Sequence, residues 1–343
     1  MADNKEYIIS FDKYKYDPFL DFVKGICIVL VILTHCINYK LDYYSGFSIW
    51  GRPAVPVFLV IQVFHCYKRG INNASFNLSK IWNRIFKPFI YCQLFILCFI
   101  AIAYLFGDYY GLCNMLIRFL KSGGLGPGAY YPWIYIQFAI LLPLFKYIYK
   151  INNLLHLLFL FVILSHLSEL FFIYFDMPEE IYSIIFIRYV FLIYIGYICV
   201  YKGLVVNKFT IPVIIISLIF TLLFVYSDIN FSPFFYTETR GWKTCHWVCY
   251  IYMTYLFLLI IKLVYDKINK NGIIVNFCIQ LGKKSYEIFL FQIAYFFLLY
   301  NFLLDHALLL LPNYLAHIVL IILSLIICIL PIYYLLIMKP KNY

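Results

Sequence analysis

The chain has 343 residues, of which 65% are hydrophobic, 22% are aromatic and only 13% are charged. Soluble domains of this size carry about one quarter charged and about one half apolar residues, and disordered chains are poor in aromatic residues. The composition therefore argues against a soluble enzyme, a secreted disulfide scaffold, a fibrous protein and a disordered chain, and it indicates a polytopic membrane protein.

The cysteines and the net charge exclude two further classes of protein. The 11 cysteines lie mostly in apolar runs and form neither a CxxC pair nor a Cys/His pattern with metal-ligand spacing. We therefore expect no metal site and interpret these thiols as small core residues. The net charge is +11. The Lys and Arg residues behind it are distributed as in membrane proteins, whose cytoplasmic loops carry an excess of basic residues. The charge therefore does not indicate a nucleic-acid partner.

Ten apolar windows of roughly 20 residues predict transmembrane helices, because that length spans a hydrocarbon core of ~30 Å. The apolar runs are continuous rather than alternating, which argues against a β-barrel and predicts an all-α fold. The windows are residues 19–38, 53–67, 89–106, 131–147, 154–174, 184–201, 211–227, 246–264, 285–304 and 314–338. The predicted organisation is a cytoplasmic segment (1–18), a ten-helix membrane domain (19–338) and a cytoplasmic tail (339–343).

The distribution of basic residues predicts the orientation of these helices. Ten spans place both termini on the same side of the membrane. If that side is the cytoplasm, 20 of the 27 Lys and Arg residues fall on it. Cytoplasmic loops carry an excess of Lys and Arg, so we expect both termini to be cytoplasmic.

The first predicted helix carries polar residues at depths where they are costly. Asp17 and Pro18 form an N-cap followed by a proline at the first helical position. Lys24 and His35 are separated by about 20° in azimuth and ~16 Å along the axis, and Asp21 lies on the same side. Intramembrane polar groups of this kind are candidate functional residues.

A cation at the inner end of a helix and an imidazole deeper on the same stripe suit a phosphorylated donor with a long reactive arm, and coenzyme A is such a donor. The imidazole of His35 would remove a proton from a sugar hydroxyl or accept an acyl group itself. The alternative is that Lys24 only snorkels to the interface and that His35 bonds a neighbouring helix.

The segment 19–35, with Lys24 and His35 flanking ten residues, resembles the opening of the acyltransferase type 3 family of integral membrane acyltransferases. Three later segments are similar to family segments in the same order, namely 83–89, 126–143 and 281–290. The resemblance covers about residues 17–304. The lysine form is similar to the branch described as fucose-type or polysaccharide O-acetylases.

This resemblance implies a protein of about ten helices in the bacterial cytoplasmic membrane. It also implies transfer of an acyl group, mostly acetyl from acetyl-CoA, to sugars of surface glycans. The chain departs from the family at Lys24 and Lys87, where many members have Arg, and at Gln292, where many have His. Lysine cannot make a bidentate phosphate contact. The Gln292 departure leaves His35 as the main candidate base.

Several other residues are candidates for binding the donor. Arg84, Lys87 and Arg69 belong to an inner cluster of basic residues that suits coenzyme phosphates, although a lipid-facing patch explains the same charges. His65 lies one helical turn after Gln62 near the inner end of the second span, where the two would line the donor entry or form a packing pair.

The outer half of the protein holds the candidates for contacting the acceptor. Glu169, near His166, would orient a histidine or accept a proton, and Arg188 would meet an acidic group of a substrate. The loop 228–247, with Arg240 and Trp242, has the aromatic and polar composition of a sugar site, but an interfacial aromatic belt has the same composition.

We therefore expect a membrane O-acyltransferase with acetyl-CoA as donor, a glycan or lipid-linked sugar as acceptor and no metal. In this hypothesis His35, Asp21 and Glu169 do the chemistry, and Lys24, Arg84, Lys87, Arg69 and His65 bind the donor. Arg188, Trp242 and Arg240 bind the acceptor. The alternatives are a glycan transporter or flippase, in which the same groups line a path, and a non-catalytic membrane scaffold.

Overall fold

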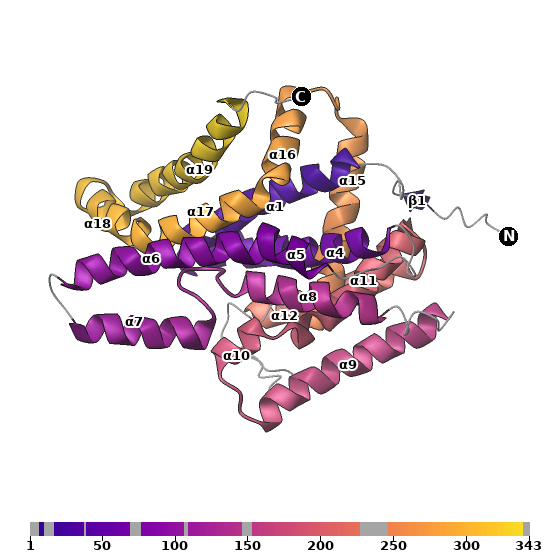
Figure 1. The fold of residues 1–343 in the computed structure, drawn as a ribbon. Coiled ribbons are helices and arrows are strands. Elements are labelled where there is room, and N and C mark those ends of the chain that lie inside the picture. The colour runs from indigo at the N-terminus through magenta and orange to yellow at the C-terminus, as the bar shows by residue number, and fades with distance from the viewer. Residues whose placement is uncertain are drawn as a thin grey trace.

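The computed structural model of the chain describes residues 7–9, 17–37, 39–68, 77–105, 109–145, 153–226 and 246–338. These residues are almost entirely helical (Figure 1). In chain order the helices are α1 (Pro18–Cys36), α2 (Tyr39–Ser45), α3 (Phe47–Trp50), α4 (Ala54–Tyr67), α5 (Leu78–Ile81), the π-helix η2 (Trp82–Phe86), α6 (Lys87–Leu105), α7 (Tyr109–Ser122), α8 (Tyr131–Phe145), α9 (Leu154–Tyr174), α10 (Glu179–Ile184), the 3₁₀-helix η4 (Phe186–Tyr189), α11 (Val190–Tyr201), α12 (Thr210–Tyr226), α14 (Trp247–Tyr250), the π-helix η5 (Ile251–Leu256), α15 (Phe257–Lys267), α16 (Ile273–Lys283), α17 (Ser285–Leu298), α18 (Tyr300–Leu310) and α19 (Asn313–Met338).

The strands that the structure describes are two short segments, β1 (Tyr7–Ile9) and β2 (Leu204–Val206). They pair antiparallel, with Ile8 opposite Val205. The pair joins the segment before α1 to the connection between α11 and α12.

Helix starts follow the local sequence. The Asp17 carboxylate accepts a hydrogen bond from the backbone N–H of Phe19 at 2.9 Å, and Pro18 occupies the first turn, as the sequence predicts. Asn153 caps α9 in the same way through the N–H of Leu155, at 2.9 Å. Side-chain caps satisfy backbone N–H groups that have no partner inside the helix.

Six helical segments among the described residues are long and apolar enough to cross a membrane: Pro18–Cys36, Phe47–Tyr67, Leu78–Ile102, Leu154–Tyr174, Trp247–Lys267 and Asn313–Tyr334. Helices α17 and α18 pass the same test together and are bent by 57°, which makes seven if the pair is one span. Shorter apolar helices are Tyr131–Phe145, Phe186–Tyr201, Thr210–Tyr226 and Ile273–Lys283. The chain is therefore a multi-pass membrane protein.

Each of the ten windows chosen from the sequence coincides with one of these helices or with the bent pair. Three of them, α8, α12 and the unit formed by η4 and α11, are too short for the length test, so ten crossings and the cytoplasmic position of both termini stay predictions. Helix α16 is not one of the ten windows, because its eleven residues end in Gly282 and Lys283 and a further lysine, Lys284, follows.

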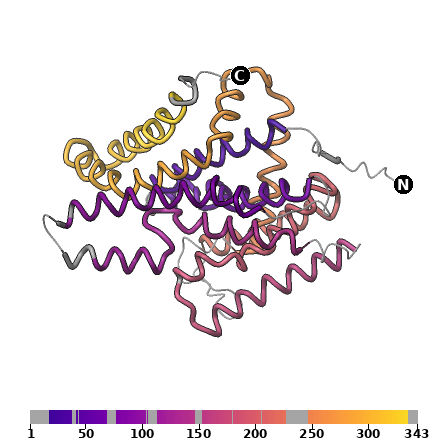
Figure 2. The backbone as a smooth tube through the Cα atoms, in the orientation of Figure 1, coloured from indigo at the N-terminus to yellow at the C-terminus, as the bar shows by residue number. Residues whose placement is uncertain are grey.

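Helix α1 lies inside the bundle, packed against α4, α16, α17 and α19 (Figures 1 and 2). Its closest neighbour is α16, and two glycines make that approach possible. A Cβ added to Gly25 would lie 1.9 Å from the carbonyl oxygen of Cys278, and one added to Gly282 would lie 1.7 Å from that of Asp21. Small residues are a general means by which membrane helices come into close contact.

We expect Gly282→Ala to destabilise the protein by ~1–3 kcal/mol, the usual range for overpacking, because the new methyl group meets the rigid backbone of α1. The matched control is Ile274→Ala on the same helix, whose side chain is 77% exposed. Both proteins are compared by thermal unfolding in detergent. Equal unfolding temperatures for Gly282→Ala and the wild type would contradict a close α1–α16 contact.

Candidate functional site

His35 lies in the last turn of α1, half-buried, with its ring centroid 5.4 Å from that of Phe296 on α17. The Tyr300 hydroxyl donates to the carbonyl oxygen of Cys36 at 3.2 Å and ties this end of α1 to α18. The positive charge of Arg52 lies within electrostatic range of His35. Arg52 is itself held by an ion pair with Asp42, at 2.7 Å. Phe296 therefore contacts the imidazole itself, Tyr300 holds the end of the helix, and Arg52 acts on the ring only through its charge.

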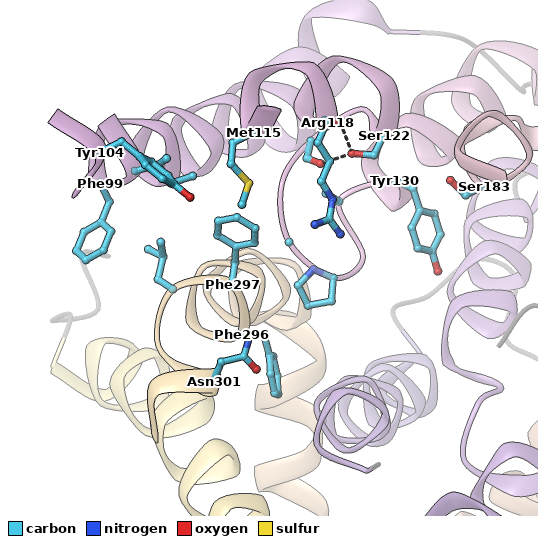
Figure 3. Close-up of a pocket in the computed structure, with 16 residues that line it drawn as sticks. Phe99, Tyr104, Met115, Arg118, Ser122, Tyr130, Ser183, Phe296, Phe297 and Asn301 are labelled. Atoms are coloured by element: carbon cyan, nitrogen blue, oxygen red, sulfur yellow. Dashed lines mark hydrogen bonds between the residues drawn. The ribbon is translucent and has the colours of Figure 1, made fainter. Parts of the chain in front are cut away.

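A cavity of about 710 Å³ adjoins this end of α1, because Phe296 forms part of its lining (Figure 3). Ligand cavities typically measure about 300–1,000 Å³. Aromatic rings at Tyr130 and Phe297 line it together with the polar side chains of Arg118, Ser122, Ser183 and Asn301. This mixture suits a ligand that presents both apolar faces and hydroxyl groups.

A glycine-rich loop between α7 and α8 forms one wall of the cavity. Gly123, Gly124, Gly126 and Gly128 all have positive φ, a conformation that glycine adopts without a steric penalty. The Gln93 side-chain amide holds this loop through two hydrogen bonds to one residue. It donates to the Leu125 carbonyl oxygen at 3.1 Å and accepts from the Leu125 N–H at 2.7 Å.

Gln292 on α17 supports the same loop. Its amide donates to the carbonyl oxygen of Pro127 at 3.4 Å. Gln292, which stands where many family members have a histidine, is therefore in contact with the cavity wall.

The opposite end of α1 carries the predicted charged residues. Lys24 and Asp21 form an ion pair, which confirms that they share one side of the helix. His65 on α4 is exposed and lies within electrostatic range of Lys24, Asp21 and Lys68. Arg84 on η2 is exposed and within electrostatic range of Tyr135 on α8. The structure therefore brings His65 to the Lys24 end of α1.

Tyrosine and phenylalanine rings occupy the region between this charged end and the cavity. The Tyr131 ring lies 5.3 Å from that of Phe289, which stacks on Tyr286 at 6.2 Å. The Tyr286 hydroxyl donates to the carbonyl oxygen of Ile85 in η2 at 2.7 Å. Phe289 also faces Gly128 of the cavity loop. This aromatic layer therefore connects the segment that carries Arg84 to the wall of the cavity.

A second polar cluster is buried beside the cavity and consists of Glu169, Tyr182, Arg188, Tyr189, His246 and Tyr250. The Tyr182 hydroxyl donates to Glu169 at 3.1 Å, and His246 Nδ1 lies 3.4 Å from the same carboxylate oxygen. The Arg188 guanidinium lies over the Tyr189 ring at 4.3 Å and the Tyr182 ring at 4.9 Å. It also donates to the Tyr189 hydroxyl.

This cluster reaches the cavity at two points. Arg188 lies 5.9 Å from the ring of Tyr130, and Ser183 follows Tyr182 in α10. Both Tyr130 and Ser183 line the cavity. The buried charges therefore lie directly behind the wall of the cavity rather than within it.

The structure separates some residues that the sequence grouped together. Asp21 and His35 are about 21 Å apart along α1 at 1.5 Å per residue. Asp21 consequently acts on Lys24 and cannot touch His35. The ammonium of Lys87 lies over the exposed ring of Tyr91, at 5.8 Å, on α6. Arg69, Arg240 and Trp242 lie outside the described residues.

Sequence reasoning missed two groups of residues. His246 was treated as part of an outer loop, but it is fully buried at the start of α14 and pairs with Glu169. Arg118 and its cavity were also missed. The available signal was the spacing of Asn114, Arg118, Lys121 and Ser122, which places polar groups on one face of an otherwise apolar helix.

Comparison with protein families matches residues 17–334 to the acyltransferase type 3 family, under the description "Acyltransferase domain". Comparison with curated proteins and with solved structures found no match. The matched region runs from the cap of α1 almost to the end of α19 and includes both ends of α1, the cavity and the buried cluster. The chain thus belongs to the acyltransferase type 3 family and is a membrane acyltransferase.

Proposed function

We propose that this protein is an O-acyltransferase that moves an acetyl group from acetyl-CoA to a sugar hydroxyl of a surface polysaccharide or glycolipid in the bacterial cytoplasmic membrane. One observation carries the proposal. Helix α1 presents Lys24 and Asp21 at its first end and His35 at its last, and only the His35 end adjoins the large cavity.

The donor binds at the Lys24 end of α1. Lys24 and His65 lie there, and Arg84 lies within electrostatic range of Tyr135 on α8. Cations form charge-assisted hydrogen bonds with phosphate oxygens. This end is the cytoplasmic one if both termini are cytoplasmic, which is where acetyl-CoA is found. Asp21 keeps the Lys24 ammonium in place through their ion pair.

The acceptor binds at the His35 end, in the cavity. Aromatic rings at Phe296 and Tyr130 offer flat apolar faces to a sugar, and Ser122, Ser183 and Asn301 offer hydrogen bonds. Phe296 lines the cavity and packs against His35, which is not itself a lining residue, so the proposal requires the acceptor hydroxyl to pass the Phe296 ring to reach the imidazole.

The transfer step then follows general-base chemistry. The His35 imidazole accepts the proton of the acceptor hydroxyl while the hydroxyl oxygen attacks the thioester carbonyl carbon. The carbon–sulfur bond breaks, the coenzyme leaves as a thiolate, and the imidazolium returns the proton to that sulfur. The products are the O-acetylated sugar and free coenzyme A. The Arg52 guanidinium, which is ion-paired with Asp42, lies within electrostatic range of this imidazole.

We expect His35→Ala to lower the rate of acyl transfer by about 10²–10⁴-fold, the usual contribution of a positioned general base. The matched control is His306→Ala, which removes an exposed imidazole on α18. Purified proteins are assayed for ester formation on a glycan acceptor and for release of free coenzyme A. Wild-type activity in a well-folded His35→Ala protein would contradict the mechanism, and movement of unmodified glycan without thioester consumption would favour a transporter.

We expect Arg84→Gln to raise the KM for acetyl-CoA by roughly 10- to 100-fold with little change in kcat. A charge-assisted hydrogen bond contributes about 1.5–3 kcal/mol, and each 1.4 kcal/mol corresponds to about tenfold in affinity. Lys208→Gln makes the same charge change at another exposed position, two residues before α12. Equal KM values for the two variants would show that Arg84 does not bind the donor.

A further inference from the structure

Helix α7 carries its polar side chains on one face. Asn114, Arg118, Lys121 and Ser122 have the spacing i, i+4, i+7 and i+8, which places them along a single stripe. On the opposite side, Leu120 is 78% exposed and Leu116 is 42% exposed. Helix α7 is not one of the candidate membrane spans, and an amphipathic helix turns its polar face toward water. Asn114, Arg118 and Lys121 are exposed, so the polar stripe faces a hydrated space.

That space is larger than the cavity next to His35. A second cavity of about 600 Å³ is lined by Asn114, Lys121 and Glu180, and it shares Arg118, Ser122 and Ser183 with the first. Two cavities with three common lining residues adjoin each other, so together they form one groove along α7. Phe296, which lines the first of these cavities, packs against His35.

Arg118 stands where the two cavities meet. Figure 3 shows its guanidinium extending from α7 into the cavity, toward the side on which Phe297 lies. Within the part of the chain that the structure describes, no carboxylate forms an ion pair with Arg118. The groove contains a second cation, Lys121, and one acidic residue, Glu180, so its charge is positive.

An arginine aimed into a cavity without an acidic partner fits a ligand that brings its own negative charge. The planar guanidinium matches carboxylate and phosphate oxygens with two parallel hydrogen bonds. The remaining lining combines the aromatic rings of Tyr130, Phe296 and Phe297 with hydroxyl and amide groups, which suits a sugar attached to that anion.

We propose that the acceptor of this acyltransferase is an anionic saccharide whose carboxylate or phosphate group is bound by Arg118, with Lys121 adding to the positive field. This inference rests on the proposed function, because it identifies the class of acceptor that the His35 cavity takes. The anion lies at the junction of the two cavities, and the sugar to be acylated lies toward Phe296.

The test compares acceptors that differ only in charge. Four ligands are used: a uronic-acid oligosaccharide, the same oligosaccharide with its carboxyl groups reduced to alcohols, a lipid phosphate-linked sugar and its dephosphorylated form. Binding to the purified protein in nanodiscs is measured by calorimetry, and acetyl transfer from labelled acetyl-CoA is measured separately. The proteins are wild type, Arg118→Gln, Arg118→Lys and Lys208→Gln.

We expect the wild type to bind one of the two charged ligands at least tenfold more tightly than its neutral counterpart. Arg118→Gln removes that preference, Arg118→Lys restores part of it, and Lys208→Gln retains it. The charged ligand that shows the preference identifies the source of the anion, an acidic sugar or a lipid phosphate.

A wild-type protein without preference for either charged ligand overturns the inference, and so does a preference that Arg118→Gln leaves intact. Failure of the proposed function gives a different result. In that case no protein consumes acetyl-CoA with any acceptor, and the binding measurements alone decide whether Arg118 recognises an anion.

Discussion

The close contact between α1 and α16 fixes the position of both ends of the candidate site. Gly25 and Gly282 remove the side chains that would hold the two helices apart, and each lets a backbone carbonyl of the other helix approach. With α1 held by α16 along one side, its remaining sides meet α4, α17 and α19. Lys24 then faces the α4 residue His65, and His35 faces the α17 residue Phe296. A shift of α1 along its axis would disturb both contacts together.

The buried cluster behind the cavity shows how the protein accommodates charges away from water. The Arg188 side chain is 1% exposed and that of Glu169 is 1% exposed, so both need partners inside the protein. Tyrosine rings cover the guanidinium, and Tyr182 contacts both residues, through its ring and through its hydroxyl. Tyr130, which lines the cavity, also lies against Arg188, so the buried cluster packs behind the cavity wall.

Features that depend on local sequence could be predicted from it. The cap at Asp17, the ion-paired side of α1 and the helical windows all follow from residue spacing and hydropathy within one segment. His35 stands out for the same reason, since an imidazole in an apolar helix is conspicuous, and its role stays a prediction. The pairing of Glu169 with His246 could not be predicted, because it joins helices that are far apart in the chain. The cavity was missed because its walls come from α6, α7, α17 and a glycine loop.

The short ladder between β1 and β2 has a topological consequence. Paired strands share one aqueous compartment, so residues 7–9 and 204–206 lie on the same side of the bilayer. The chain between them must cross the membrane an even number of times. Of the segments that pass the length test, α1, the unit of α3 and α4, the segment Leu78–Ile102 and α9 lie in that interval. If each of these four candidate segments crosses once, the parity is satisfied, and it stays satisfied when the shorter helices α8 and α11 both cross.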